Sequence, residues 1–237
     1  MRTRLVLFDV DGTLIDTAGA GRRAVERAFT DVFAIDAAAR PNGVRYAGMT
    51  DPSIFLALAG ALAIDAAIYE ERRTRLHETY LTHLAAEMER GDPRRRVLPG
   101  VVELLDDLST RRGTHLGLLT GNLERGARIK LEPFGLNRFF ASGGFGSDHA
   151  DRAVIARVAA EKLVAPSRDG IEPSQVVVVG DTEHDVACAR ANGFRAVAVA
   201  SGFVSREVLE RSAPDALLGD LTDRMAALRA LGYGDER

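Results

Sequence analysis

Four aspartates, arranged as two pairs, are the residues whose types and spacing best suit chemistry. Asp9 and Asp11 are separated by one residue, and Gly12 permits the chain to turn directly after them. Asp181 and Asp185 form the second pair, and each pair follows a short apolar run. Carboxylates gathered at one place repel each other unless a hard cation lies among them, and oxygen ligands suit Mg²⁺. The two pairs therefore predict a magnesium site.

A possible phosphate site follows a third apolar run at Thr120, Gly121 and Asn122. A hydroxyl group and free backbone amides at the start of a helix favour an anion. A divalent cation beside a carboxylate favours chemistry on phosphate, because it screens the charge between an anionic nucleophile and an anionic substrate. We therefore expect these three residues to bind phosphate, with a further cation on the far side of it.

The elements that must position these residues are short buried strands. Four apolar runs rich in strand formers end in turn signals, and stretches with helical spacing separate them. Strands that alternate with helices predict an α/β fold, a Rossmann-like doubly wound parallel sheet, whose ligands bind beyond the carboxyl ends of the strands. The expected strands are residues 4–8, 115–119, 176–179 and 196–200, and the expected helices are 101–108, 123–131, 153–163 and 185–191.

The region from residue 17 to residue 96 breaks this alternation, because it has helical patterns and no clear strand. It predicts an all-helical cap of residues 17–96 inserted into a core of residues 1–16 and 97–237. Glycines near both ends of the insertion suit hinges. If the cap closes over the core, Arg22, Arg23, Thr50 and Asp51 are candidates for substrate contact.

Composition excludes several other classes of protein. A chain of 237 residues suits one core domain with an insertion, and a net charge of -3 gives no general attraction for nucleic acid. No apolar run approaches the roughly 20 residues that span a membrane, so we expect no membrane partner. The single cysteine, Cys188, excludes an internal disulfide, indicates the cytoplasm, and is expected to be a small buried filler. The sequence does not distinguish a monomer from a homodimer.

Three segments resemble signature motifs of the haloacid dehalogenase superfamily, in its phosphoglycolate phosphatase-like branch with a helical cap. They read DVDGTL from residue 9, TGN from residue 120 and VVVVGDTEHD from residue 176, and they occur in the family's order. The resemblance covers essentially the whole chain. It implies a Rossmann-like core, a mobile cap and an aspartyl-phosphate intermediate.

The resemblance also implies roles for single residues. Asp9 would be the nucleophile, and Asp11 would protonate the leaving group and later activate water. Thr120 would bind the transferring phosphoryl group. Asp9, the backbone carbonyl of Asp11, and Asp181 would hold Mg²⁺, with Asp185 as a further ligand or a supporting carboxylate.

One position departs from the family's pattern. Where this branch usually carries a lysine that neutralises the nucleophile and the phosphate, this sequence reads GSDHADR, and Arg152 occupies the corresponding place. We therefore expect Arg152 to act in both catalysis and phosphate binding. The chain has two lysines, Lys130 and Lys162, and both are expected to be solvated surface charges.

The sequence favours a Mg²⁺-dependent phosphatase that acts on a small phosphorylated metabolite. One alternative is a phosphomutase of the β-phosphoglucomutase type, which passes the phosphoryl group to a sugar. Another is a non-catalytic relative that binds a phosphorylated ligand. Dehalogenation is disfavoured, because Asp11 and the crowded carboxylates would have no purpose in it.

Overall fold

The core of the molecule is a six-stranded parallel sheet with the strand order β5-β4-β1-β6-β7-β8. The computed structural model describes residues 3–39, 43–164 and 171–234. The strands are β1 (Arg4–Phe8), β4 (Thr114–Leu119), β5 (Gly143–Gly144), β6 (Val176–Gly180), β7 (Arg195–Val199) and β8 (Ala216–Leu218). The predicted α/β fold with a parallel sheet is confirmed.

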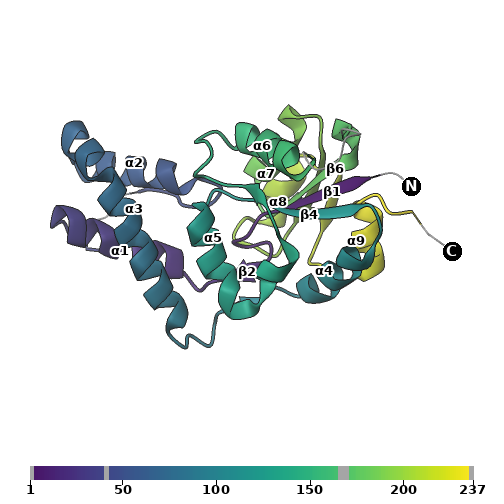
Figure 1. The fold of residues 1–237 in the computed structure, drawn as a ribbon, viewed down its shortest axis with the longest axis horizontal. Helices are drawn as coiled ribbons and strands as arrows, with labels where there is room; N and C mark the ends of the chain where they lie inside the picture. Colours follow the sequence, from purple (N-terminus) through teal and green to yellow (C-terminus); the bar gives the residue numbers. More distant parts are fainter. Residues whose placement is uncertain (1–2, 40–42, 165–170, 235–237) are drawn as a thin grey trace.

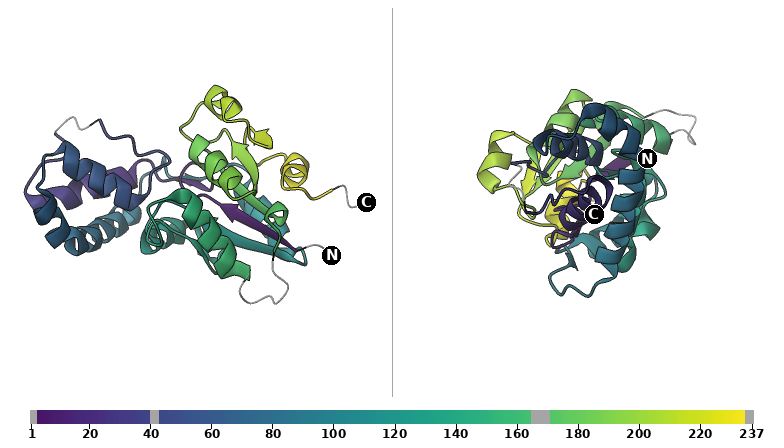
Figure 2. Two further views of the ribbon diagram at one scale, coloured as in Figure 1. Left: turned by 90° about the horizontal axis from the view of Figure 1, so that it is seen from above. Right: turned by 90° about the vertical axis from the view of Figure 1, so that its left-hand side faces the viewer.

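Helices cover both faces of this sheet, as Figures 1 and 2 show. Val6 and Phe8 of β1 pack into one apolar cluster, whereas Leu5 and Leu7 pack into another on the opposite face. This two-sided burial explains why the strand reads as a continuous apolar run. One face carries α4 (Val101–Thr110), α5 (Glu124–Leu131) and α9 (Arg224–Ala230), and the other carries α6 (Arg152–Val164), α7 (Glu183–Ala191) and α8 (Arg206–Arg211).

The strand order places three distant chain segments beside one another at the carboxyl ends of the central strands. β1 pairs with β4 on one side and with β6 on the other, in parallel in both cases. The chain therefore changes direction across the sheet at β1, which is the switch point where α/β proteins bind their ligands. Residues 9, 120 and 181 each directly follow one of these three strands.

The remaining helices lie together at one end of the molecule, far from both termini (Figure 1). They are α1 (Ala20–Phe33), α2 (Asp51–Ala61) and α3 (Ala66–Glu89), and they share an apolar cluster that includes Phe29, Phe55 and Tyr80. The two connections to the core pair as antiparallel strands β2 (Ile15–Asp16) and β3 (Arg96–Val97). We call the three helices, together with the described segments that connect them, the cap; the domain boundaries at 16/17 and 96/97 stay a prediction.

Local capping explains where several of these helices begin. The Thr50 hydroxyl accepts from the backbone N–H of Ser53 at the start of α2, and Thr182 and Asp185 cap α7 reciprocally. The edge strands β5 and β8 and the helices α8 and α9 were not predicted. β5 consists of two glycines and therefore has no side-chain pattern. Among the described residues, no helix is both long and apolar enough to cross a membrane.

Candidate active site

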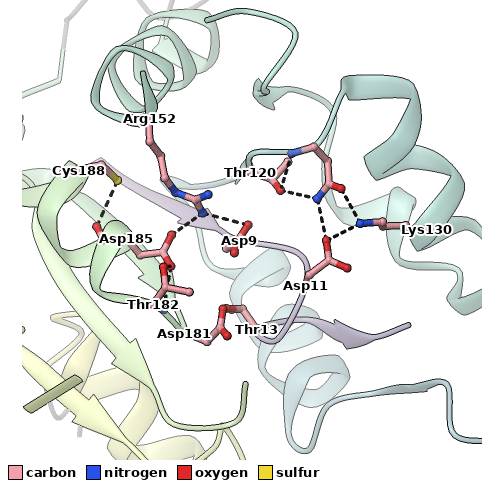
Figure 3. Close-up of polar contacts among 11 residues, drawn as sticks. Asp9, Asp11, Thr13, Thr120, Lys130, Arg152, Asp181, Thr182, Asp185 and Cys188 are labelled. Carbon is pink, nitrogen blue, oxygen red and sulfur yellow. Dashed lines mark hydrogen bonds and ion pairs between the residues drawn. The ribbon is translucent and has the colours of Figure 1, made fainter. Parts of the chain in front are cut away.

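Three of the four predicted carboxylates are buried and meet at the carboxyl ends of the strands, and the carboxylate of Asp11 is not among them (Figure 3). One oxygen from each of Asp9, Asp181 and Asp185 lies within 4.8 Å of the others. Burial raises the pKa of Asp9 to about 6, and burial and the neighbouring carboxylates raise the pKa of Asp181 well above its usual value. Such a cluster ionises fully only with added positive charge. Its all-oxygen donor set fits a hard divalent cation such as Mg²⁺.

Arg152 supplies a permanent positive charge to this cluster. It is the first residue of α6, and its Nη2 lies 2.5 Å from Oδ1 of Asp185 and 3.2 Å from Oδ1 of Asp9. Burial lowers the pKa of Arg152, but Asp185 and Asp9 outweigh that effect and raise it overall. The structure thus places Arg152 beside Asp9, the predicted nucleophile, and the catalytic roles of both residues stay predictions.

Asp181 and Asp185 are bound differently by the protein. Oδ2 of Asp185 accepts from the hydroxyl (2.7 Å) and the backbone N–H (3.0 Å) of Thr182, and its Oδ1 is paired with Arg152. Asp181 accepts a longer bond, 3.3 Å, from the hydroxyl of Thr13. Gly12 adopts a φ of 84°, and a Cβ there would lie 2.3 Å from Oδ2 of Asp181, so only glycine permits this close approach. Asp185 is therefore the more fully engaged carboxylate.

The fourth aspartate points away from the other three (Figure 3). Oδ2 of Asp11 lies 2.6 Å from Nζ of Lys130 and accepts a bond of 2.9 Å from the side-chain amide of Asn122. The prediction that Lys130 is a solvated surface charge is wrong, because this residue is only 5% exposed. The start of the cap helix α1 lies against its ammonium group, a contact that spacing along α5 does not reveal. Lys162 is exposed, as predicted, and it pairs with Asp148.

The predicted phosphate site lies between the core and the cap. Thr120 is buried, and its Oγ1 accepts a bond of 2.7 Å from the side-chain amide of Asn122. Gly121 packs so closely against the cap that a Cβ would lie 2.3 Å from the carbonyl oxygen of Met49. Thr120, Gly121 and Asn122 therefore lie together beside the cap, and Asn122 links Thr120 to Asp11; their role in phosphate binding stays a prediction.

Asp51 connects the cap to the start of α5. It is buried, its backbone N–H donates to the carbonyl of Gly121 (2.7 Å), and its Oδ2 accepts from the backbone N–H of Leu123 (2.8 Å). Of the other cap candidates, Arg22 lines the same cavity as Asp51. Thr50 caps α2, and Arg23 instead pairs with the carboxylate of Glu87.

A charge-removing substitution at Asp51 should stabilise the protein in a pH-dependent way. Burial raises the pKa of Asp51 to about 6, and Lys130 only partly offsets this. The folded state holds the carboxyl proton of Asp51 more tightly than the unfolded state does. The Asp51 carboxyl therefore increasingly destabilises the folded state as pH rises from about 4 to about 6. We expect Asp51→Asn to raise the free energy of unfolding by up to about 3 kcal/mol at pH 7 and by almost nothing at pH 4.

Chemical denaturation of wild type and Asp51→Asn between pH 4 and pH 7 measures this difference. The matched control is Asp65→Asn at the exposed N-cap of α3, where asparagine caps as well as aspartate. A difference between wild type and Asp51→Asn that stays constant over this pH range would contradict the expectation.

A cavity of about 730 Å³ joins these groups. The core contributes all the predicted site residues except Asp185, whose side chain is paired with Arg152. The cap contributes Asp51 together with apolar and positively charged side chains. Cys188 is buried, as predicted; it does not line the cavity, and its Sγ donates to the backbone carbonyl of Asp185. The cavity side chains from the cap include Arg22, Val25, Val44, Arg45, Tyr46, Ile54 and Tyr80.

Comparisons with known proteins agree with this geometry. Residues 6–199 match the haloacid dehalogenase-like hydrolase family. The chain is 30% identical to a phosphoglycolate phosphatase of Agrobacterium fabrum, over 94% of this chain and 91% of that protein. It is also 30% identical to a phosphoglycolate phosphatase of Synechococcus elongatus, over 95% of this chain and 97% of that protein.

A solved structure shows the same fold. A crystal structure from Haemophilus somnus, described as a predicted phosphoglycolate phosphatase, superposes with a TM-score of 0.72 over 96% of this chain and 98% of that one, at 18% identity. At this identity the likeness concerns the fold alone. The match over residues 6–199 goes further, and the chain belongs to the haloacid dehalogenase-like hydrolase family.

Proposed function

We propose that this protein is a Mg²⁺-dependent phosphatase that hydrolyses a small phosphorylated metabolite through an aspartyl-phosphate intermediate. One observation carries the proposal: Asp9 lines a cavity at the switch point of the sheet, paired with Arg152 and within 4.8 Å of two further buried carboxylates. The names of its relatives support hydrolysis of a phosphate ester.

The carboxylate cluster suggests how the ion would be held. Asp9, Asp181 and the backbone carbonyl of Asp11 would be its ligands, and it would screen the charge between the nucleophile and the phosphate. Asp185 is already engaged by Thr182 and Arg152, so we assign it a supporting role in which it orients the guanidinium.

The proposed reaction consists of two successive displacements at phosphorus. A carboxylate oxygen of Asp9 attacks phosphorus, and the bond from phosphorus to the leaving oxygen breaks while Asp11 gives that oxygen a proton. Arg152 and Thr120 hold phosphoryl oxygens. Asp11 next takes a proton from water, whose oxygen attacks phosphorus, so that phosphate leaves and the Asp9 carboxylate is restored.

The cap side of the cavity favours a substrate whose remaining part is also anionic. Arg22, Arg45 and Arg96 line it in addition to Lys130 and Arg152 of the core; Arg22 also pairs with Glu26, and Arg96 with Asp16. A carboxylate beside the phosphate, as in phosphoglycolate, would meet this positive charge. The relatives of Agrobacterium fabrum and Synechococcus elongatus are named for that substrate, which supports the same choice.

A phosphate-release assay on purified protein tests the proposal. The panel contains 2-phosphoglycolate, sugar phosphates, nucleotides, pyrophosphate and p-nitrophenyl phosphate, each with Mg²⁺ or with a chelator. We expect Mg²⁺-dependent release that is fastest with 2-phosphoglycolate. Absence of release from every ester contradicts a phosphatase, and isomerisation of a sugar phosphate that needs a bisphosphate activator would favour the phosphomutase.

A further inference from the structure

Lys130 is a buried charge that the proposed chemistry does not yet use. It lies in the last turn of α5, it is 5% exposed, and it lines the same cavity as the carboxylates. Burying an ammonium group is costly unless it is paired and hydrogen-bonded. The chain has only one other lysine, and that residue is exposed. The stability of the buried ammonium group of Lys130 therefore depends on the groups that pair with it.

Its partners are Asp11 and the residue that links Asp11 to the phosphate site. Nζ lies 2.6 Å from Oδ2 of Asp11 and 2.6 Å from Oδ1 of Asn122. The amide of Asn122 donates to the same Oδ2 (2.9 Å) and to Oγ1 of Thr120 (2.7 Å). Two donors therefore hold one oxygen of the Asp11 carboxylate, and its other oxygen is the one that can carry a proton to the substrate.

The cap completes the surroundings of this lysine. A Cβ on Gly21 of α1 would lie 3.3 Å from Nζ, so the first turn of that helix borders the ammonium group. Burial lowers the pKa of Lys130, but Asp11 and Asp51 raise it by a larger amount, so the residue remains a cation. Asp51 belongs to the cap and Asp11 to the core.

Arg152 has a different task from Lys130. Arg152 is paired with Asp9 and Asp185, on the side of the cluster away from Asp11. Within the described part of the chain, the ammonium group of Lys130 instead donates its hydrogen bonds to Asp11 and Asn122. The site thus has one cation for the nucleophile and another for the aspartate two residues later (Figure 3).

We propose that Lys130 is a positioning residue that, together with Asn122, holds the Asp11 carboxyl in the orientation needed to protonate the leaving group. This rests on the proposed function. If Lys130 only stabilised the contact between the cap and the core, its substitution would lower the rate for all substrates by the same factor. A residue that orients the proton donor affects most strongly those substrates whose leaving group needs the proton.

The test compares two phosphate esters in wild type and Lys130→Met. One is the alkyl phosphate that wild type hydrolyses fastest, and the other is p-nitrophenyl phosphate, whose leaving group departs as a stable anion. We expect Lys130→Met to lower kcat/KM about 100-fold for the alkyl ester and less than about 5-fold for the aryl ester. Lys162→Met, at the other lysine, should leave both values unchanged.

A double-mutant cycle with Asp11→Asn separates positioning from other roles. If Lys130 acts through Asp11, adding Lys130→Met to Asp11→Asn should cost less than about 3-fold more with the alkyl ester. Lys130→Gln, which retains a hydrogen-bond donor, should recover part of the loss. It also replaces Lys130→Met in the comparison if thermal melting shows that the methionine variant does not fold.

Equal losses for the two esters, or a full additional loss in the double variant, would overturn the positioning role while leaving the phosphatase intact. A loss in KM alone would also overturn it, because a phosphate-binding cation gives that result. If wild type hydrolyses neither ester, the proposed function fails, and the role of Lys130 fails with it.

Discussion

Asp9→Asn is expected to reduce kcat by roughly 10⁴-fold or more, the largest effect of any single substitution in this chain. Asparagine keeps the shape of the side chain but removes the carboxylate that we propose as the nucleophile. It should not unfold the protein, because it removes one negative charge from a buried group of three. Steady-state kinetics with the best substrate measures the loss, and thermal melting confirms the fold.

The matched control is Asp31→Asn, the same chemical change at an exposed carboxylate in the cap. We expect its kcat to stay within roughly a factor of two of wild type, as for other surface changes away from a site. If Asp9→Asn retains a tenth of the wild-type rate, some other group must be the nucleophile.

The second large effect is expected at Asp181. Asp181→Asn should lower kcat roughly 10³-fold and move the Mg²⁺ dependence to higher concentrations, because the proposed ligand changes from a charged carboxylate to a neutral amide. Chelation of the metal from wild type should lower the rate at least as much. Activity measured across a Mg²⁺ titration, together with calorimetric binding of Mg²⁺, follows both quantities.

Asp185→Asn is the informative comparison for Asp181→Asn. Because Asp185 is bound by Thr182 and Arg152, we expect its substitution to change the position of the Arg152 guanidinium and to weaken the N-terminal capping of α7. Mg²⁺ binding should change less. Equal losses of Mg²⁺ affinity in the two variants would instead make Asp185 a direct ligand.

Much of the fold follows from local patterns in the sequence. β1 is predicted with its observed bounds, because burial on both faces produces an uninterrupted apolar run from Leu5 to Phe8. The edge strands differ: the side chains of β8 are only partly buried, and β5 has no side chains. Their pairing depends on neighbouring strands, which local pattern does not encode.

The candidate site is predictable where residues follow strands and less so where they lie on helices. Asp9, Thr120 and Asp181 each come directly after a central strand, so the topology alone brings them together. Lys130 lies in the last turn of α5. Its neighbours in the sequence are a mixture of polar and apolar residues, a pattern typical of an exposed helix face. The packing of the cap against this helix determines its burial, and no short motif records that packing.

The identity of the nucleophile is the central claim, and trapping the intermediate tests it most directly. Wild-type enzyme turning over its substrate with Mg²⁺ is quenched with borohydride, which reduces an acyl phosphate to an alcohol and so converts the phosphorylated aspartate to homoserine. Peptide mass spectrometry then identifies the position. The account predicts homoserine at residue 9, dependent on both substrate and Mg²⁺, whereas reduction at another carboxylate, or at none during active turnover, would contradict it.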